Sequence, residues 1–120
     1  MKGRHYVAVF GNAADVKSIR PDFGELTHLD RPTIAVTAAG VDVDYVLRFF
    51  APANGVPEDP VSGVAQCSLV PFWAAELGRN KLKSRQLSAR GGTMDCELKG
   101  SRVVITGACT SIARGKLACA

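Results

Sequence analysis

An acidic residue and a glycine stand close together where a proline-rich loop meets a long apolar run. The stretch reads Gly55-Val-Pro-Glu-Asp-Pro-Val-Ser-Gly-Val-Ala-Gln66. Because Pro60 disfavours the helical region for the residue before it, Asp59 is expected to be held extended, and Gly63 allows a tight turn. A carboxylate aimed in this way is a candidate for general acid/base chemistry.

The same junction predicts a site for a small anion. The run from Val64 to Leu77 is apolar enough for a core helix. The first amides of a helix have no intrahelical acceptor and carry partial positive charge, so Gly63 and Val64 are candidates for binding a substrate carboxylate. The alternative is an ordinary loop-to-helix junction, in which Asp59 and Gly63 only shape the backbone.

Further segments on both sides of this junction form a recognisable series. They are Arg48-Phe-Phe-Ala-Pro-Ala-Asn-Gly-Val-Pro-Glu-Asp-Pro-Val-Ser-Gly63, Leu69-Val-Pro-Phe-Trp-Ala-Ala-Glu-Leu-Gly78 and Gln86-Leu-Ser-Ala-Arg-Gly-Gly92, preceded by Tyr6-Val-Ala-Val-Phe10 and Ile19-Arg-Pro-Asp-Phe23. In this order they resemble the C-terminal lobe of the PhzF-like phenazine-biosynthesis family. The resemblance covers nearly the whole chain.

The resemblance implies a diaminopimelate epimerase-like fold, in which two similar lobes enclose an active site between their central helices. This chain matches one lobe. Asp59 matches the family's active-site aspartate, and Gly63 matches the glycine whose amide helps to bind a substrate carboxylate. The implied activity is a cofactor-independent isomerisation by proton transfer. The family's acid/base glutamate and a histidine belong to the other lobe, and no segment of this sequence matches them.

Two positions depart from the family motif, which often reads Asp-Pro-Xaa-Thr-Gly-Ser-Ala-His. This sequence reads Asp59-Pro-Val-Ser-Gly-Val-Ala-Gln66. Val64 therefore keeps the backbone amide but lacks the hydroxyl, and Gln66 replaces the histidine. A backbone anion site survives both changes, whereas a step that needs the hydroxyl does not.

The pattern of apolar and turn residues predicts a single α+β lobe over residues 1–120, with an antiparallel or mixed sheet wrapped around a central apolar helix. A short helix is expected at residues 13–19, after Asn12. Strands are expected at residues 6–10, 32–37, 43–50, 83–89, 93–98, 102–106 and 111–117, the last four as a meander.

Composition limits the partners. The net charge of +4 is modest, and Arg79, Lys81, Lys83 and Arg85 alternate with other residues, as on one solvated strand face, so no nucleic-acid partner is expected. The four cysteines lack zinc-site spacings, and no metal or other cofactor is expected. No secretory leader or membrane partner is indicated, and the thiols are expected to be reduced in the cytoplasm.

Three functions stay open. The first is an isomerase lobe that needs a complementary N-terminal lobe, and the second is a homodimer in which two copies mimic the two-lobe fold. The third reading is a non-catalytic domain that binds a small ligand or a partner protein. In each case the expected small-molecule partner carries a carboxylate, recognised at Gly63 and Val64 beside Asp59.

Overall fold

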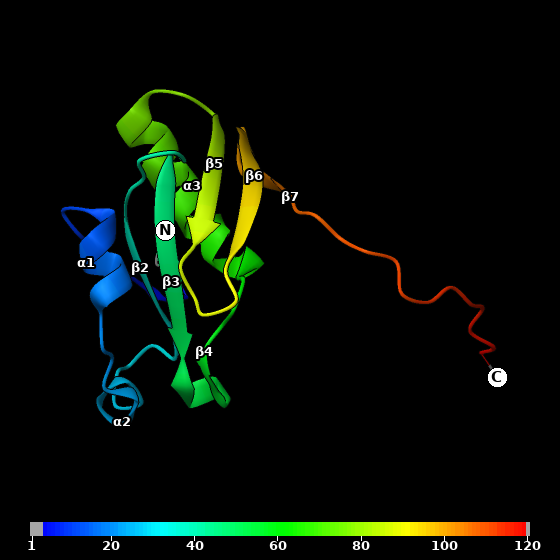
Figure 1. Ribbon diagram of the computed structural model, residues 1–120, viewed down its shortest axis with the longest axis horizontal. Helices are drawn as coiled ribbons and strands as arrows, with labels where there is room; N and C mark the ends of the chain where they lie inside the picture. Colours follow the sequence, from blue (N-terminus) through cyan, green and yellow to red (C-terminus); the bar gives the residue numbers. More distant parts are fainter. Residues whose placement is uncertain (1–3, 120) are drawn as a thin grey trace.

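The computed structural model of the protein describes residues 4–119 and has an α+β fold built on one mixed sheet (Figure 1). The strands are β1 (Tyr6–Val9), β2 (Ile34–Ala39), β3 (Tyr45–Ala51), β4 (Val56–Glu58), β5 (Lys81–Gln86), β6 (Gly92–Lys99) and β7 (Arg102–Thr106). Their order is β1-β2-β3-β5-β6-β7, and β4 also pairs with β3. The β1–β2 and β3–β5 pairs are parallel and the others are antiparallel, which confirms the predicted mixed sheet.

The central helix is α3 (Gly63–Leu77), close to the predicted boundaries. Ser62 caps its N-terminus, and Gly78 ends it in a left-handed conformation with φ of 65°. The sheet-facing side of α3 buries Leu69, Val70 and Trp73 against odd-numbered residues of β3. The Trp73 indole also donates a hydrogen bond to Thr37 Oγ1 at 3.0 Å, which satisfies its polar atom in the core.

The opposite face of the sheet is covered by α1 (Ala13–Ser18), while α2 (Phe23–Leu26) follows α1 in the chain. Asn12 caps α1 as predicted, accepting a hydrogen bond from the Asp15 amide at 2.9 Å. Val16 on α1 packs against even-numbered residues of β3, including Val46 and Phe50. The strand β3 is therefore buried on both faces and joins two clusters of apolar residues.

One predicted strand is wrong, and two short elements were missed. Residues 111–117 were expected to form a strand, but residues 107–119 contain no helix or strand and extend away from the body as an exposed tail (Figure 1). The helix α2 and the strand β4 were not predicted, because a single turn and a three-residue strand are too short to give a periodic pattern. The β6–β7 hairpin was predicted and is confirmed, with Lys99 paired to Arg102.

The solvated face predicted for the basic run is also present. In β5 exposed and buried residues alternate: the side chains of Lys81 and Lys83 are exposed, and those of Leu82 and Ser84 are buried. No helix within the described residues has the length and apolar character needed to cross a bilayer.

Candidate functional site

The loop that carries Asp59 is fixed to the sheet on both sides of that residue. Gly55 turns the chain with φ of 81°, and β4 then pairs back onto β3. The Asp59 amide donates to the Phe49 carbonyl at 2.9 Å, and the Asp59 carbonyl accepts from Gln86 Nε2 at 2.6 Å. Both backbone polar groups of Asp59 are therefore used, and its side chain is positioned by a rigid main chain.

The N-terminus of α3 leaves two amides available. Ser62 Oγ accepts from the Ala65 amide at 3.3 Å, and the Ser62 amide donates to Gln86 Oε1 at 2.7 Å. Within residues 4–119 no protein group accepts a hydrogen bond from the amides of Gly63 or Val64. These two donors lie at the positive end of a helix of 15 residues, where an anion is stabilised.

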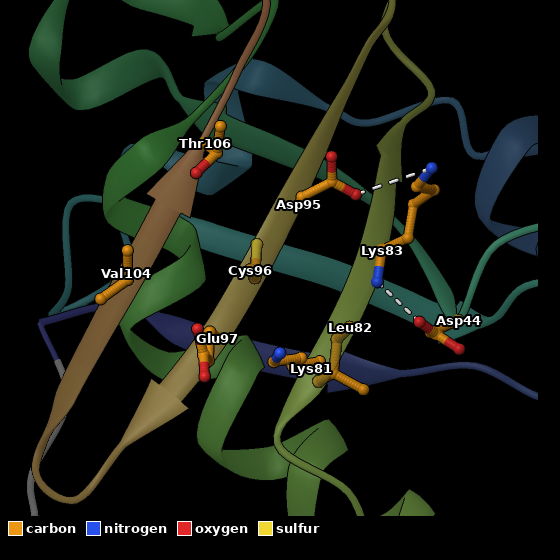
Figure 2. Close-up of a pocket in the computed structure, with 9 residues that line it drawn as sticks. All are labelled: Asp44, Lys81, Leu82, Lys83, Asp95, Cys96, Glu97, Val104 and Thr106. Carbon is orange, nitrogen blue, oxygen red and sulfur yellow. Dashed lines mark hydrogen bonds and ion pairs between the residues drawn. The ribbon is translucent and has the colours of Figure 1, made fainter.

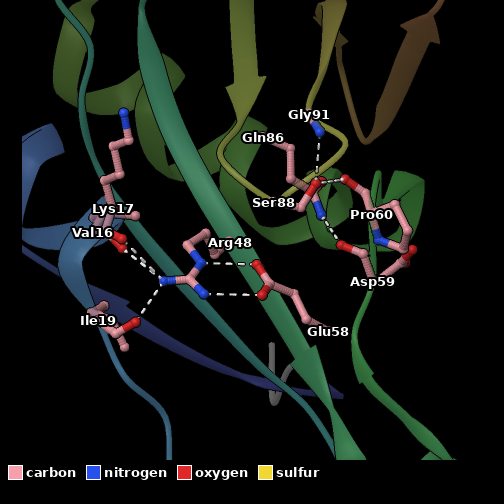
Figure 3. A network of polar contacts seen from close by, with 10 residues as sticks. All are labelled: Val16, Lys17, Ile19, Arg48, Glu58, Asp59, Pro60, Gln86, Ser88 and Gly91. Atoms are coloured by element: carbon pink, nitrogen blue, oxygen red, sulfur yellow. Dashed lines mark hydrogen bonds and ion pairs between the residues drawn. The ribbon is translucent and has the colours of Figure 1, made fainter.

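Gln86 is the residue that connects these two features, and sequence reasoning did not single it out. Its side chain is buried and bonds to the backbone on both sides of Pro60, at Asp59 and at Ser62. Ser88 adds a bond from its hydroxyl to the Pro60 carbonyl at 2.6 Å (Figure 3). Gln86 begins one of the segments that carry the family resemblance and stands at an inward-facing strand position, where a buried amide needs partners, but neither signal shows which groups it binds.

A pocket of about 480 Å³ lies beside Asp59 and Val64. Phe49, Ala51 and Val56 make much of its wall apolar, and Arg4 and Asn54 also line it. Of the three predicted residues, Asp59 and Val64 therefore line one cavity. Gly63 precedes Val64 in the chain but does not line the cavity.

His5 lines the same pocket and was not predicted as a site residue. Its side chain packs edge-on against Phe49, with ring centroids 5.4 Å apart. Nε2 is buried and has no hydrogen-bond partner among the described residues. Burial, with a smaller contribution from the charge of Arg31, lowers the pKa of His5 below 6.5. A neutral imidazole therefore stands in the pocket that Asp59 lines.

Gln66, which occupies the position of the family histidine, points into the core instead of this pocket. It accepts a hydrogen bond from the Tyr45 hydroxyl and donates to Ser84 Oγ at 3.3 Å. Its side chain is fully buried and its polar atoms are satisfied by the protein. Gln66 is therefore a structural residue here and is unavailable to a ligand.

A second cavity, of about 350 Å³, lies over β5, β6 and β7 (Figure 2). Most of its charged groups have partners, since Lys83 Nζ lies 3.6 Å from Asp95 and the Lys83 amide donates to Asp44 Oδ2 at 2.6 Å. This arrangement is a surface ion-pair network of mixed charge. Within residues 4–119 no cluster of three or more His, Cys, Asp or Glu side chains is placed to hold a metal ion.

The Asp59 pocket is therefore lined by a carboxylate, a neutral imidazole, the guanidinium group of Arg4 and Val64, whose amide, free within residues 4–119, is preceded by that of Gly63 just outside the lining. The amides suit an anionic group, and the apolar wall suits a carbon skeleton. Asp59 and His5 are groups that can carry protons.

Comparisons with known proteins place the chain among relatives. The chain is 49% identical over 102 residues to an uncharacterized isomerase of Pseudomonas aeruginosa, covering 85% of this chain and 39% of that protein. A second uncharacterized isomerase of the same species is 41% identical over 107 residues, covering 89% of this chain and 41% of that protein. The chain thus spans about two fifths of the length of these relatives.

Solved structures share the fold as well as the sequence. A crystal structure of a phenazine biosynthesis protein of the PhzF family from Enterococcus faecalis superposes with a TM-score of 0.84 at 41% identity, covering 86% of this chain and 40% of that chain. The family described as phenazine biosynthesis-like protein, PhzC-PhzF, matches residues 3–115. By this match and by its relatives, the chain belongs to the phenazine biosynthesis-like (PhzC-PhzF) family.

Proposed function

We propose that the chain provides half of an isomerase active site, which binds a small carboxylate substrate and moves a proton within it. The observation that carries this proposal is the placing of Asp59 beside a pocket at the N-terminus of α3, where the amides of Gly63 and Val64 have no acceptor among residues 4–119. The description of relatives as isomerases supports the reaction class.

In this proposal the substrate carboxylate accepts hydrogen bonds from the Gly63 and Val64 amides. Asp59 then exchanges a proton with a neighbouring carbon, so that one C–H bond breaks and its electron pair shifts along the substrate. A second acid/base group, the glutamate that the family carries on its other lobe, delivers a proton to a different carbon. Each such group contributes about a hundred- to ten-thousand-fold in rate.

The chain alone is expected to show little or no isomerisation, because no segment of it matches that glutamate. The test is proton exchange in deuterated water with small unsaturated or cyclic carboxylic acids, measured for wild type and Asp59→Asn. Asp95→Asn is the matched control, since Asp95 is an exposed carboxylate on β6. Robust wild-type exchange that survives Asp59→Asn would contradict the role given to Asp59.

The carboxylate site is tested separately by removing one amide. Gly63→Pro deletes the donor at the first position of α3, where proline is tolerated, and Ser62 is already extended at φ −111° and ψ 114° as proline requires of its predecessor. Gly63→Ala keeps the amide, and its added Cβ would lie 4.0 Å from Ile105 Cδ1. Benzoate and sulfate should shift the Val64 amide resonance in wild type and Gly63→Ala, and bind more weakly to Gly63→Pro. Equal affinity in all three proteins would rule out this anion site.

A specific observation favours a partner at this face. The side of α3 that turns away from the sheet exposes Val64 (52% exposed), Cys67 and Pro71. We infer that a complementary lobe or a second copy of the chain covers it, and that a homodimer could serve as a non-catalytic binding domain. Sedimentation equilibrium checks the second copy. A wild-type dimer that the Cys67→Glu variant dissociates would support a homodimer through this face of α3. A wild-type monomer at high micromolar concentration would contradict it.

A further inference from the structure

A third cavity, distinct from the Asp59 pocket and from the cavity over β5, β6 and β7, is strongly basic. It holds about 690 Å³ and lies where the end of α1 approaches β3 and the loop between β5 and β6. Its charged lining residues are Lys17, Arg20, Arg48, Arg85 and Arg90, and no acidic residue lines it. We call this cavity the basic pocket. It shares no lining residue with the Asp59 pocket.

Two of these cations are already engaged in ion pairs. Arg48 forms a two-pronged pair with Glu58, with N–O distances of 2.8 and 2.9 Å, and also donates to carbonyls at the end of α1, including Ile19 at 2.8 Å (Figure 3). Arg85 pairs with Asp42 at 2.7 Å. These contacts fix both guanidinium groups at the wall of the basic pocket.

The other three cations have no such partner. Within the described residues, the side chains of Lys17, Arg20 and Arg90 form no ion pair or hydrogen bond. Three uncompensated positive charges at one concave site repel one another and raise the local concentration of anions. An anionic occupant would relieve this repulsion.

The loop that carries Arg90 is held in place. Ser88 donates to the Pro60 carbonyl at 2.6 Å and accepts from the Gly91 amide at 3.0 Å, and Gly91 adopts φ of 70°, which favours glycine. The backbone on either side of Arg90 is therefore ordered before any ligand binds, which lowers the entropic cost of binding.

We propose that the basic pocket binds a small molecule carrying two or more phosphate groups. The guanidinium fork matches phosphate oxygens, and several free cations favour more than one anionic group. No aromatic side chain lines the pocket, so bases cannot stack there as they do in single-stranded nucleic-acid sites. The chemistry therefore fits a compact polyphosphate better than a nucleic-acid strand.

The test uses inorganic pyrophosphate as the probe, with binding followed by calorimetry at about 0.1 M salt, where the Debye length is about 10 Å. Wild type should bind saturably, with one site per chain and a dissociation constant below about 1 mM. The double variant Arg20→Ala with Arg90→Ala should bind at least about tenfold more weakly. The matched control is Arg102→Ala with Lys116→Ala, which removes the same charge from exposed positions outside the pocket.

The control variant should keep wild-type affinity, and so should Asp59→Asn, because Asp59 does not line the basic pocket. Failure of wild type to saturate would overturn the proposal. Equal weakening in the pocket and control variants would overturn it too, since it would mean only diffuse attraction to a positive chain. A single-stranded oligonucleotide that binds more tightly than pyrophosphate would replace the small-molecule assignment with a nucleic-acid one.

Discussion

At the scale of single residues, the candidate site depends on groups that the fold leaves without partners. The amides of Gly63 and Val64 and the Nε2 atom of His5 all lack a protein acceptor or donor among residues 4–119. Only the His5 atom is buried, where a missing partner costs about 1 to 3 kcal/mol, whereas the two amides belong to residues that are half-buried or exposed. Their grouping around Asp59 is a stronger argument for a ligand than any one of them.

His5 should make stability depend on pH. The pKa of His5 in the folded protein lies below the ordinary value of 6.5 that applies to the unfolded chain. Between these two pKa values the unfolded state binds more protons than the folded state. The free energy of unfolding therefore falls as the pH falls through about 6.5. The His5→Gln variant should lose this contribution. The measurement is urea unfolding at a series of pH values, together with an NMR titration of His5. The exposed His28→Gln is the control, and an unchanged slope in His5→Gln would contradict the prediction.

Gln86→Ala should destabilise the protein by about 2 to 4 kcal/mol, because it leaves both the Asp59 carbonyl and the Ser62 amide without a partner. The expected change is a lower urea midpoint with the same slope. The exposed neighbour Thr93→Ala should change stability by less than about 0.5 kcal/mol. Similar losses in the two variants would show that Gln86 does not hold this loop.

The sequence predicts Asp59, Gly63 and Val64 as site residues from local signals: a proline after the acid, a glycine at a turn and an apolar run behind it. His5 and Gln86 could not be found in this way. They lie far from the loop in the sequence and reach it only through pairing of strands in space. Their roles come from burial and lost solvation, which a single sequence does not display.

At the scale of elements, the start of α3 is closely packed against the beginning of β6. A Cβ atom added to Gly92 would lie 2.5 Å from Cγ2 of Val61, the residue before the helix cap. Since β-branched side chains have few rotamers, Val61 has little freedom to move away. This contact ties the position of the helix N-terminus to the sheet.

Gly92→Ala is therefore expected to cost about 1 to 3 kcal/mol, and Val61→Ala should reduce that cost when the two changes are combined. The measurement is a double-mutant cycle by chemical unfolding. Gly100→Ala is not a suitable control because of its left-handed φ of 58°, whereas Gly11→Ala adds a Cβ with no heavy atom within 4 Å. Strictly additive effects of Gly92→Ala and Val61→Ala would contradict the steric explanation.

Elements with a clear period were predictable, and short or unpaired ones were not. The helix α3 and the hairpin β6–β7 follow from apolar runs and turn residues alone. A strand was predicted at residues 111–117 in the tail, but a strand needs a neighbour to hydrogen-bond, and no strand of the described residues pairs with it. Local sequence can favour a strand, but the strand forms only where a neighbouring strand is available for hydrogen bonding.

At the scale of the whole molecule, the exposed tail and the exposed side of α3 both suit contacts with another polypeptide. Ile112 and Leu117 in the tail are 96% and 95% exposed. Isolated exposed apolar residues are common on soluble domains, but here they accompany an apolar helix face that the described residues do not cover. The two surfaces are candidates for one interface.

Brief treatment with trypsin should cut first after Arg114 and Lys116, because the tail has no secondary structure in a lone chain. Mass spectrometry of the early products identifies the first cleavage sites. The rest of the chain up to Thr106 should stay intact. If the tail pairs with a neighbouring strand in a homodimer, cleavage should slow as protein concentration rises. Early cuts at Lys81 or Lys83 would instead show that β5 is less stable than the fold implies.

The parallel pairing of β3 with β5 bears on how quickly this molecule reaches its native state. Two strands in that arrangement cannot be joined by a tight turn, so the chain must first close a long loop that contains β4 and all of α3. The hairpins β5–β6 and β6–β7 need only local contacts and can form within microseconds, whereas the β3–β5 contact gains its enthalpy only after the loop-closure entropy is lost. Refolding is therefore expected to be limited by the docking of α3 with its two flanking strands, and Asp59 reaches its final position only in that last step.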